Sequence, residues 1–417
     1  MKTKSLSLPL AAIAIALAAH TARADEAAPG VLLAPIASHL PDGVSLTGNI
    51  TIDAIGNSRG GRSRGSAPVV LTDFRLSLDF DKLVQTKGLS AYVHLMNHGL
   101  DRINADRVGA LTGVTNIEAS HSGTKLYRLW VEKEWKEPGA ALRLGLFPLE
   151  DEFFTMEAAA SFIHPTNGPQ GDYAGTLGAA IYNHAGFGAR LRLESDDRSR
   201  YAMFAILDRP LDDTNFVRTS GLSFPRAPGT QAMVELGLTP LEASGDETPE
   251  RFDKTAIGIW AYSRGDDHLS RQDSTGQPLK ARSNGWYALK ERTLWASNHQ
   301  PGALAGFIRV SGGDGRAYAV DRAINAGLRL AGWVPGRSAD VSAVMVVLQK
   351  LGPAWRERVL NAGLAPAPSE NVLELNHRIA LHPSLAVMPL VQWISQPGGL
   401  RQTASSRVIG ARISLAL

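Results

Sequence analysis

The chain has 417 residues, with 43 Lys and Arg against 40 Asp and Glu, and it contains no cysteine. The lack of cysteine excludes a disulfide framework and a thiolate metal site. Basic and acidic residues are interspersed and form no block, so the sequence predicts no nucleic-acid partner. Hydrophobic residues make up 44% of the chain. This share suits a water-soluble β protein and also a membrane barrel with a wet interior.

The N-terminus has the pattern of a secretory signal peptide. Lys2 and Lys4 precede an apolar run over residues 6–19, and the small-x-small motif of residues 22–24 follows. The run is shorter than the ~20 residues of a spanning helix, which argues against a membrane anchor. We therefore predict a signal peptide over residues 1–24. Its removal takes away three cations and no acid, so the formal net charge falls from +3 to zero.

Residues 25–43 contain three prolines and are expected to form an extended or loosely helical lead-in. From Val44 on, the chain returns repeatedly to segments in which every second side chain is apolar. In residues 44–54 one face would carry Val, Leu, Gly, Ile and Ala, and the other Ser, Thr, Asn and Asp. Successive side chains of a strand point to opposite faces, so the segment predicts a strand with one apolar and one polar side.

Similar segments recur to the end of the chain and suggest about sixteen strands, each long enough to span a bilayer when tilted. After residues 44–54 they lie near residues 74–80, 89–95, 126–135, 141–147, 175–182, 187–194, 201–207, 232–238, 255–262, 286–294, 304–310, 323–330, 341–348, 372–381, 385–394 and 408–417. Residues 44–417 contain no run of 18 apolar residues. In a bilayer only a closed barrel would then satisfy the backbone.

We therefore predict an all-β protein, a transmembrane antiparallel β-barrel of the outer-membrane porin type, with residues 44–417 as a single barrel domain. Short turns such as residues 183–186 alternate with long loops such as residues 210–230, which is typical of outer-membrane barrels. Alternation alone also fits a soluble β-sandwich or solenoid. Residues 150–169 are expected either to fold into the lumen and narrow it or to form an ordinary external loop.

If the apolar face is taken as lipid-facing, the other face gathers charge and aromatic rings. An Arg on the lipid face at the midplane would cost about 2–4 kcal/mol, so the charged face is expected to line the interior. Sugars suit such a wall, because their C–H faces lie on aromatic rings and their hydroxyls bond guanidinium and carboxylate groups. The predicted lumen residues are Arg75, Asp79, Arg128, Trp130, Glu132, Trp286, Arg292, Phe307, Arg309, Arg329, Glu374 and Arg378.

For each tryptophan of this set, the alternative is a place in an aromatic girdle at the membrane surface. Strand-register errors of one residue exchange the two faces, so the pattern alone leaves both readings open. Replacing Arg309 with Ala is expected to alter sugar flux or conductance without changing the heat-modifiable migration of the folded barrel.

Several separated segments resemble the carbohydrate-selective porins of the OprB family. They are GVTNIE at 113–118, LYRLWVE at 126–132, LGLF at 144–147, DEF at 151–153, GFIR at 306–309, GWVPGR at 332–337 with Asp340, EL at 374–375, PLVQWI at 389–394 and PGG at 397–399. The resemblance implies a sixteen-stranded barrel, trimeric or monomeric, that admits monosaccharides and small oligosaccharides by diffusion. Family members usually end in an aromatic residue read by the barrel-assembly machinery, whereas this sequence ends Leu-Ala-Leu.

The sequence contains no HExxH, Walker loop, GxSxG elbow or cysteine nucleophile, so we expect neither an enzyme nor a cofactor. The best catalytic candidate is residues 266–268, Asp-Asp-His, in a polar loop that turn chemistry explains more readily. We predict passive diffusion of carbohydrates across the outer membrane, with outer-membrane lipid and the barrel-assembly machinery as partners, and the barrel as either a monomer or a homotrimer. The alternatives are an outer-membrane barrel enzyme of the protease or lipase type and a non-conducting structural barrel.

Overall fold

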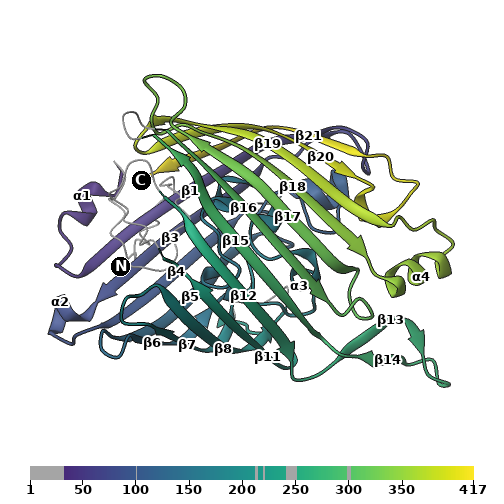
Figure 1. Cartoon of the computed structure of the whole chain (residues 1–417), viewed down its shortest axis with the longest axis horizontal. Helices are drawn as coiled ribbons and strands as arrows, with labels where there is room; N and C mark the ends of the chain where they lie inside the picture. Colours follow the sequence, from purple (N-terminus) through teal and green to yellow (C-terminus); the bar gives the residue numbers. More distant parts are fainter. Residues whose placement is uncertain (1–31, 100, 212–214, 219–220, 241–250, 298–301) are drawn as a thin grey trace, which may run out of the picture.

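The computed structural model of the chain describes residues 32–99, 101–211, 215–218, 221–240, 251–297 and 302–417. The predicted signal peptide, residues 1–24, lies outside the described residues and stays a prediction. Within the described part, sixteen long antiparallel strands form one closed barrel (Figure 1). None of the helices in these ranges is both long enough and apolar enough to cross a membrane.

The strands of the barrel follow one another around it in chain order. They are β1 (Val44–Arg59), β3 (Val69–Asp79), β4 (Leu89–His98), β5 (Gly123–Trp135), β6 (Ala140–Phe147), β7 (Gly186–Glu194), β8 (Arg200–Pro210), β11 (Arg226–Leu238), β12 (Asp253–Tyr262), β15 (Asn284–Ala296), β16 (Ala303–Gly313), β17 (Val320–Ala331), β18 (Val341–Leu351), β19 (Ser369–His382), β20 (Leu385–Ser395) and β21 (Ser406–Ala416).

Smaller elements lie in the connections between the strands of the barrel. The short strands are β2 (Gly65–Ser66), β9 (Val217–Arg218), β10 (Gly221–Leu222), β13 (Asp266–Gln272) and β14 (Pro278–Ala281). The α-helices are α1 (Ala34–Ala37), α2 (Phe80–Val84), α3 (Gly171–Ala174) and α4 (Pro353–Asn361).

The first strand closes the barrel by pairing with the last. The β1–β21 ladder runs from Asn49 opposite Ala416 to Arg59 opposite Arg407, with one register shift near its end. On its other side β1 pairs with β3 over residues 44–53. Closure leaves no unpaired edge, so each strand finds hydrogen-bond partners on both sides, as a spanning sheet requires.

The strands bury polar side chains and expose apolar ones, which is the reverse of the pattern in a soluble β-sandwich. In β18 the inward Met345 and Gln349 are buried, whereas the outward Val346 and Leu348 are exposed. Polar side chains such as Asp53 and Glu374 are fully buried inside. Apolar groups outside and charged groups inside suit a sheet surrounded by lipid. The membrane-barrel prediction is therefore confirmed against the sandwich and solenoid alternatives.

The two rims of the barrel differ in the length of their connections. Connections at the rim that carries the end of β21 are short, such as residues 136–139 and 383–384, and those at the other rim are long, such as residues 99–122 and 352–368. Helix α4 and the β13–β14 hairpin lie at the long-loop rim (Figure 1). In outer-membrane barrels the long loops are extracellular and the short turns periplasmic.

One predicted strand is wrong. Residues 175–182 follow α3 in an irregular stretch of the long β6–β7 connection and are not part of the sheet. The backbone N–H of Ala180 donates to the Gln231 side chain, and that of Tyr182 donates to Glu150. The segment is apolar because it packs inside the barrel. A buried loop of this kind has a composition similar to that of an alternating strand, so the sequence pattern does not separate the two.

Candidate functional site

The interior of the barrel is partly filled by the β6–β7 connection, residues 148–185. Phe153, Phe154, Phe162 and Ile163 of this connection are almost wholly buried, and α3 lies within the outline of the barrel (Figure 1). Residues 150–169 therefore fold into the lumen and do not form an external loop. We call residues 148–185 the inward loop.

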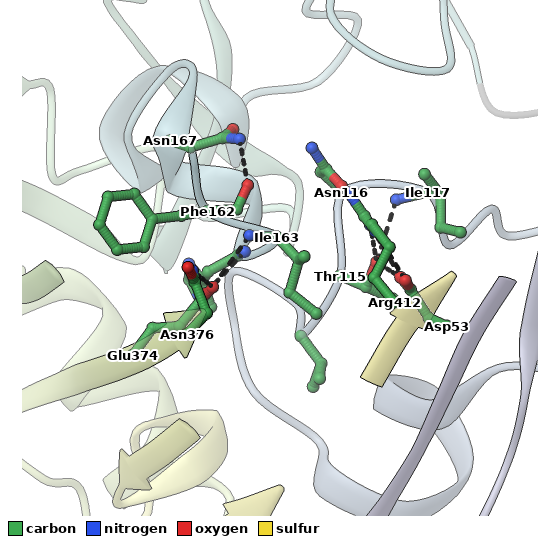
Figure 2. A network of polar contacts seen from close by, with 12 residues as sticks. Asp53, Thr115, Asn116, Ile117, Phe162, Ile163, Asn167, Glu374, Asn376 and Arg412 are labelled. Carbon is green, nitrogen blue, oxygen red and sulfur yellow. Dashed lines mark hydrogen bonds and ion pairs between the residues drawn. The ribbon is translucent and has the colours of Figure 1, made fainter. Parts of the chain in front are cut away.

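Glutamates of the barrel wall hold the inward loop by accepting its backbone N–H groups. The Glu374 carboxylate accepts from Ile163 and His164, each at 3.0 Å, as Figure 2 shows for Ile163. Glu291 accepts from the backbone of Ala158 at 2.9 Å. A carboxylate that accepts buried N–H groups satisfies donors that a loop away from water would otherwise leave unpaired.

Arg309, on β16, holds the same loop through its carbonyl groups. Its guanidinium donates to the carbonyl oxygens of Phe154 at 2.6 Å, Asn167 at 3.1 Å and Thr166 at 3.2 Å, and also to that of Gly168. The side chain is 0% exposed. Arg309 therefore points into the barrel, where it contacts the loop and has no surface facing the open lumen.

A second connection, described over residues 101–122, also folds inward and contacts the two strands that close the barrel. Arg412 of β21 donates two hydrogen bonds to Asp53 of β1, at 2.7 and 2.8 Å, and a third at 2.7 Å to the Asn116 side chain. Thr115 donates to the same aspartate (Figure 2). The backbone N–H of Asn116 donates to Ile163 O at 2.7 Å, so the two inward connections support each other.

Charged side chains on the opposite part of the wall remain partly accessible. Arg128 of β5 pairs with Asp151 of the inward loop and donates to His94 Nδ1 at 2.8 Å. Arg75 of β3 lies 3.0 Å from Asp73. The Arg128 and Arg75 side chains are 19% and 22% exposed. We call the inner faces of β3 to β7 the charged wall.

Trp130 and Glu132 lie next to each other on the charged wall. The Trp130 ring stacks on Tyr92 with centroids 5.2 Å apart, and the Arg143 guanidinium lies 4.0 Å from the Trp130 centroid. Glu132 accepts from Arg143 at 2.9 Å and from Arg190 at 2.5 Å. Aromatic rings and paired charges thus alternate here. Trp130 and Arg143 are themselves buried, so the groups that can reach a sugar are the partly exposed Tyr92 and Glu132 side chains.

Four other predicted lumen residues lie inside with different surroundings. Arg329 and Arg378 occupy the inward faces of β17 and β19, and Arg378 is exposed there. Phe307 is buried edge-on against Phe162, with ring centroids 5.8 Å apart. Asp79 ends β3, and its carboxylate caps α2 by accepting from the backbone at residues 81 and 82. Of this group, Arg378 has an exposed side chain in the lumen, and the Arg329 guanidinium lies 5.3 Å from the Phe252 ring centroid.

Trp286 and Arg292 were predicted in the lumen, and the structure corrects both. Their neighbours Tyr287 and Glu291 on β15 are buried inside, whereas Trp286 is 49% exposed and the Arg292 side chain is 66% exposed on the outer face. The aromatic and cationic residues of β15 alternate with inward groups, and a displacement of one residue exchanges the faces. Trp286 therefore has a position typical of an aromatic girdle.

The Asp-Asp-His candidate at residues 266–268 does not form a catalytic arrangement. Asp266 is bound by Arg209, with contacts of 2.7 and 2.9 Å, and by Ser283 at 2.8 Å. His268 Nδ1 accepts the backbone N–H of Ser270 at 3.2 Å. The carboxylate and the imidazole thus have separate structural contacts, with no hydrogen bond between them to position a general base.

Sequence reasoning missed several residues that hold the inward connections. Glu235 accepts the backbone N–H of Phe154 at 3.1 Å and the Tyr201 and Tyr287 hydroxyls at 2.6 and 2.5 Å. The alternating pattern of β11 would have placed Glu235 inside, between the outward Val234 and Leu236. No sequence signal marks an inward acid as the partner of a loop backbone.

Comparisons with known proteins agree with this architecture. Residues 64–417 match the family described as carbohydrate-selective porin, OprB family. The high-pH structure of Pseudomonas putida OprB has a TM-score of 0.79 at 16% identity, covering 90% of this chain and 94% of that one. Salmonella typhi OmpF in complex with daunomycin gives 0.55 at 9% identity, with 88% and 96% covered.

The anion-selective porin from Comamonas acidovorans gives a TM-score of 0.51 at 12% identity and covers 90% of this chain and 99% of its own. At such identities these likenesses concern the fold. No curated protein matches the sequence.

Proposed function

Because the chain belongs to the OprB family of carbohydrate-selective porins, we propose a route by which carbohydrates cross it. The protein is an outer-membrane barrel through which carbohydrates diffuse passively. In our proposal, solutes pass along the accessible part of the charged wall, beside the places where Asp151 and Glu152 of the inward loop pair with Arg128 and Arg143. The observation that carries this route is the difference in exposure between Arg128 and Arg75, which keep accessible surface, and Arg309, which keeps none.

The chemistry of the charged wall favours neutral, hydroxyl-rich solutes. Most of its arginines are already paired with carboxylates, as in the Glu132 contacts to Arg143 and Arg190. A paired wall has little net field to attract ions, yet its groups can exchange hydrogen bonds with hydroxyls. The partly exposed Tyr92 ring, which stacks on the buried Trp130, would add an apolar surface for the sugar ring.

Arg329 and Arg378 complete the route on the other side of the lumen. Both lie on inward faces toward the short-turn rim, and Arg378 makes one weak side-chain bond, at 3.4 Å to Ala339 O. Replacing Arg378 should therefore change the charge in the lumen without breaking a buried hydrogen-bond network. Arg292 offers a matched control, because it is also exposed but lies on the outer face.

The route is tested by solute-driven swelling of proteoliposomes, with sugars compared against a zwitterionic amino acid of equal size. Arg378→Ala should change the sugar rate by a few-fold, since it removes a charge from the lumen. Arg292→Ala should leave the rate unchanged. Equal responses of the two variants would contradict the proposed route, and equal rates for sugar and amino acid would contradict the selectivity.

We further propose that the barrel-assembly machinery inserts the protein and that three copies associate. The support is the resemblance to the OprB family, which implies a trimeric or monomeric barrel, and the closed barrel that the chain shares with porins. Chemical cross-linking in native outer membranes tests the association, and a single band at the monomer mass would contradict it.

The proposal assigns no catalysis, because Asp266 and His268 make structural contacts. Hydrolysis of lipid or peptide by the purified barrel would contradict that part.

A further inference from the structure

A row of paired residues crosses the outer face of the barrel at the long-loop rim. Trp286 lies opposite Gly312, Gly312 opposite Arg322, and Arg322 opposite Lys350. These four residues belong to β15, β16, β17 and β18 in order. The row therefore places one indole ring and two cations side by side on the surface that faces the membrane, at the extracellular rim.

The ladder sets the two cations of this row directly against each other. Like charges on facing cross-strand positions destabilise a sheet. Within the described part of the chain, neither Arg322 nor Lys350 has a carboxylate within 4.0 Å, and neighbouring Asp321 forms no ion pair with them. The arrangement recurs at the seam, where Arg59 lies opposite Arg407. A bound anion would remove the repulsion.

The surface below the two cations is apolar. Ile324 on β17 and Leu348 on β18 are 43% and 46% exposed, and both lie two positions toward the membrane centre from the row. At the other end of the row, the Trp286 ring covers Gly312, since a Cβ on that glycine would lie 3.1 Å from Trp286 Nε1. Indole rings prefer the level of the lipid headgroups, where cations cost little.

We propose that Arg322 and Lys350 bind the phosphate group of an outer-leaflet lipid, whose acyl chain lies on Ile324 and Leu348. Guanidinium binds phosphate in a two-pronged manner, and the lysine adds a point charge from the facing strand. The adjoining apolar residues Ile324 and Leu348 favour a lipid over free phosphate, because free phosphate has no acyl chain to contact them. Trp286 borders the headgroup on one side. The site lies outside the lumen and is independent of the sugar route.

The test measures binding of bisphosphorylated lipid A to the folded barrel in detergent, by native mass spectrometry and titration. The double variant Arg322→Ala with Lys350→Ala should weaken binding by about ten-fold or more, since each cation near a charged lipid surface contributes about a fivefold factor. The charge-conserving exchange Arg322→Lys with Lys350→Arg should retain most of the affinity. Sugar-driven swelling should not change in either variant.

Arg356→Ala is the matched control, because Arg356 is an exposed cation on α4 and has no place in the row of paired strand residues. It should bind the lipid as the wild type does. Dephosphorylated lipid A should bind the wild-type barrel about as weakly as the phosphorylated lipid binds the double alanine variant. The proposal would be overturned by unchanged binding in that variant, by equal binding of the dephosphorylated lipid, or by inorganic phosphate binding as tightly as the lipid.

Discussion

Arg309 and Arg128 both point into the barrel from its wall, yet their surroundings differ completely. Arg309 is fully buried and donates only to carbonyl groups of the inward loop, whereas Arg128 pairs with Asp151 and keeps 19% of its side chain exposed. Arg309 thus binds the backbone of the inward loop and is covered by it, whereas Arg128 binds one side chain of that loop and keeps part of its surface accessible. The side of the barrel against which the inward loop packs decides between the two roles.

The largest effect is expected for Arg309→Ala. The change leaves up to four buried carbonyls without their donor, at a cost of about 3 kcal/mol or more, so the inward loop should leave the wall. Single-channel conductance should rise and discrimination among sugars should fall. Heat-modifiable migration should persist because the strand ladder is intact.

Arg128→Ala is the corresponding change on the open side. It should alter solute passage while the inward loop stays in place. If both arginine variants released the loop equally, or if neither changed conductance, the contrast between the two sides of the lumen would be wrong.

A smaller effect is expected for Glu374→Leu, which removes the acceptor of the Ile163 and His164 N–H groups. Two buried donors lose their partner, which costs about 1–3 kcal/mol each. Hydrogen exchange of the backbone at residues 158–168 should accelerate, while exchange in β19 stays slow. Glu194→Leu, at an accessible position of β7, is the comparison, and faster exchange of the inward loop in that variant would contradict the assignment.

On the charged wall, Trp130→Ala should lower sugar flux by a few-fold without releasing the inward loop. The ring stacks on Tyr92 and lies beneath Arg143, and it makes no hydrogen bond to that loop. Swelling rates with sugars and with linear polyols separate a stacking role from simple obstruction. Trp393→Ala, on the outer face, should have no effect. A uniform change for all solutes would point to pore width instead.

The smallest effect is expected at the short-turn rim, where the Arg337 guanidinium holds the pKa of Asp340 below its ordinary value. A carboxyl with a lowered folded-state pKa contributes stability above its unfolded pKa of about 3.9 and loses it as the pH falls further. Asp340→Asn should therefore lower the unfolding temperature at neutral pH, and the difference from the wild type should shrink below about pH 4. A difference independent of pH would contradict this ion pair.

The membrane-barrel class was predictable from local pattern. Outward Val346 and Leu348 alternate with inward Met345 and Gln349, and this period of two belongs to the backbone of any strand. The absence of a spanning helix in the sequence then left a closed barrel as the structure able to satisfy the backbone in lipid. Errors occurred where one residue of register decides the face, as for Trp286 and Arg292 on β15.

The amino-acid sequence by itself determined the strands, the barrel and the family resemblance, because alternation and short motifs are local properties of the chain. Only the tertiary structure decided which inward charges face open space. The inward loop is separated from its partners Glu235, Arg309 and Glu374 by long stretches of chain, and its own backbone groups make the contacts. Backbone N–H and C=O groups are the same in every residue, so no sequence pattern can announce which carboxylate or guanidinium will bind them.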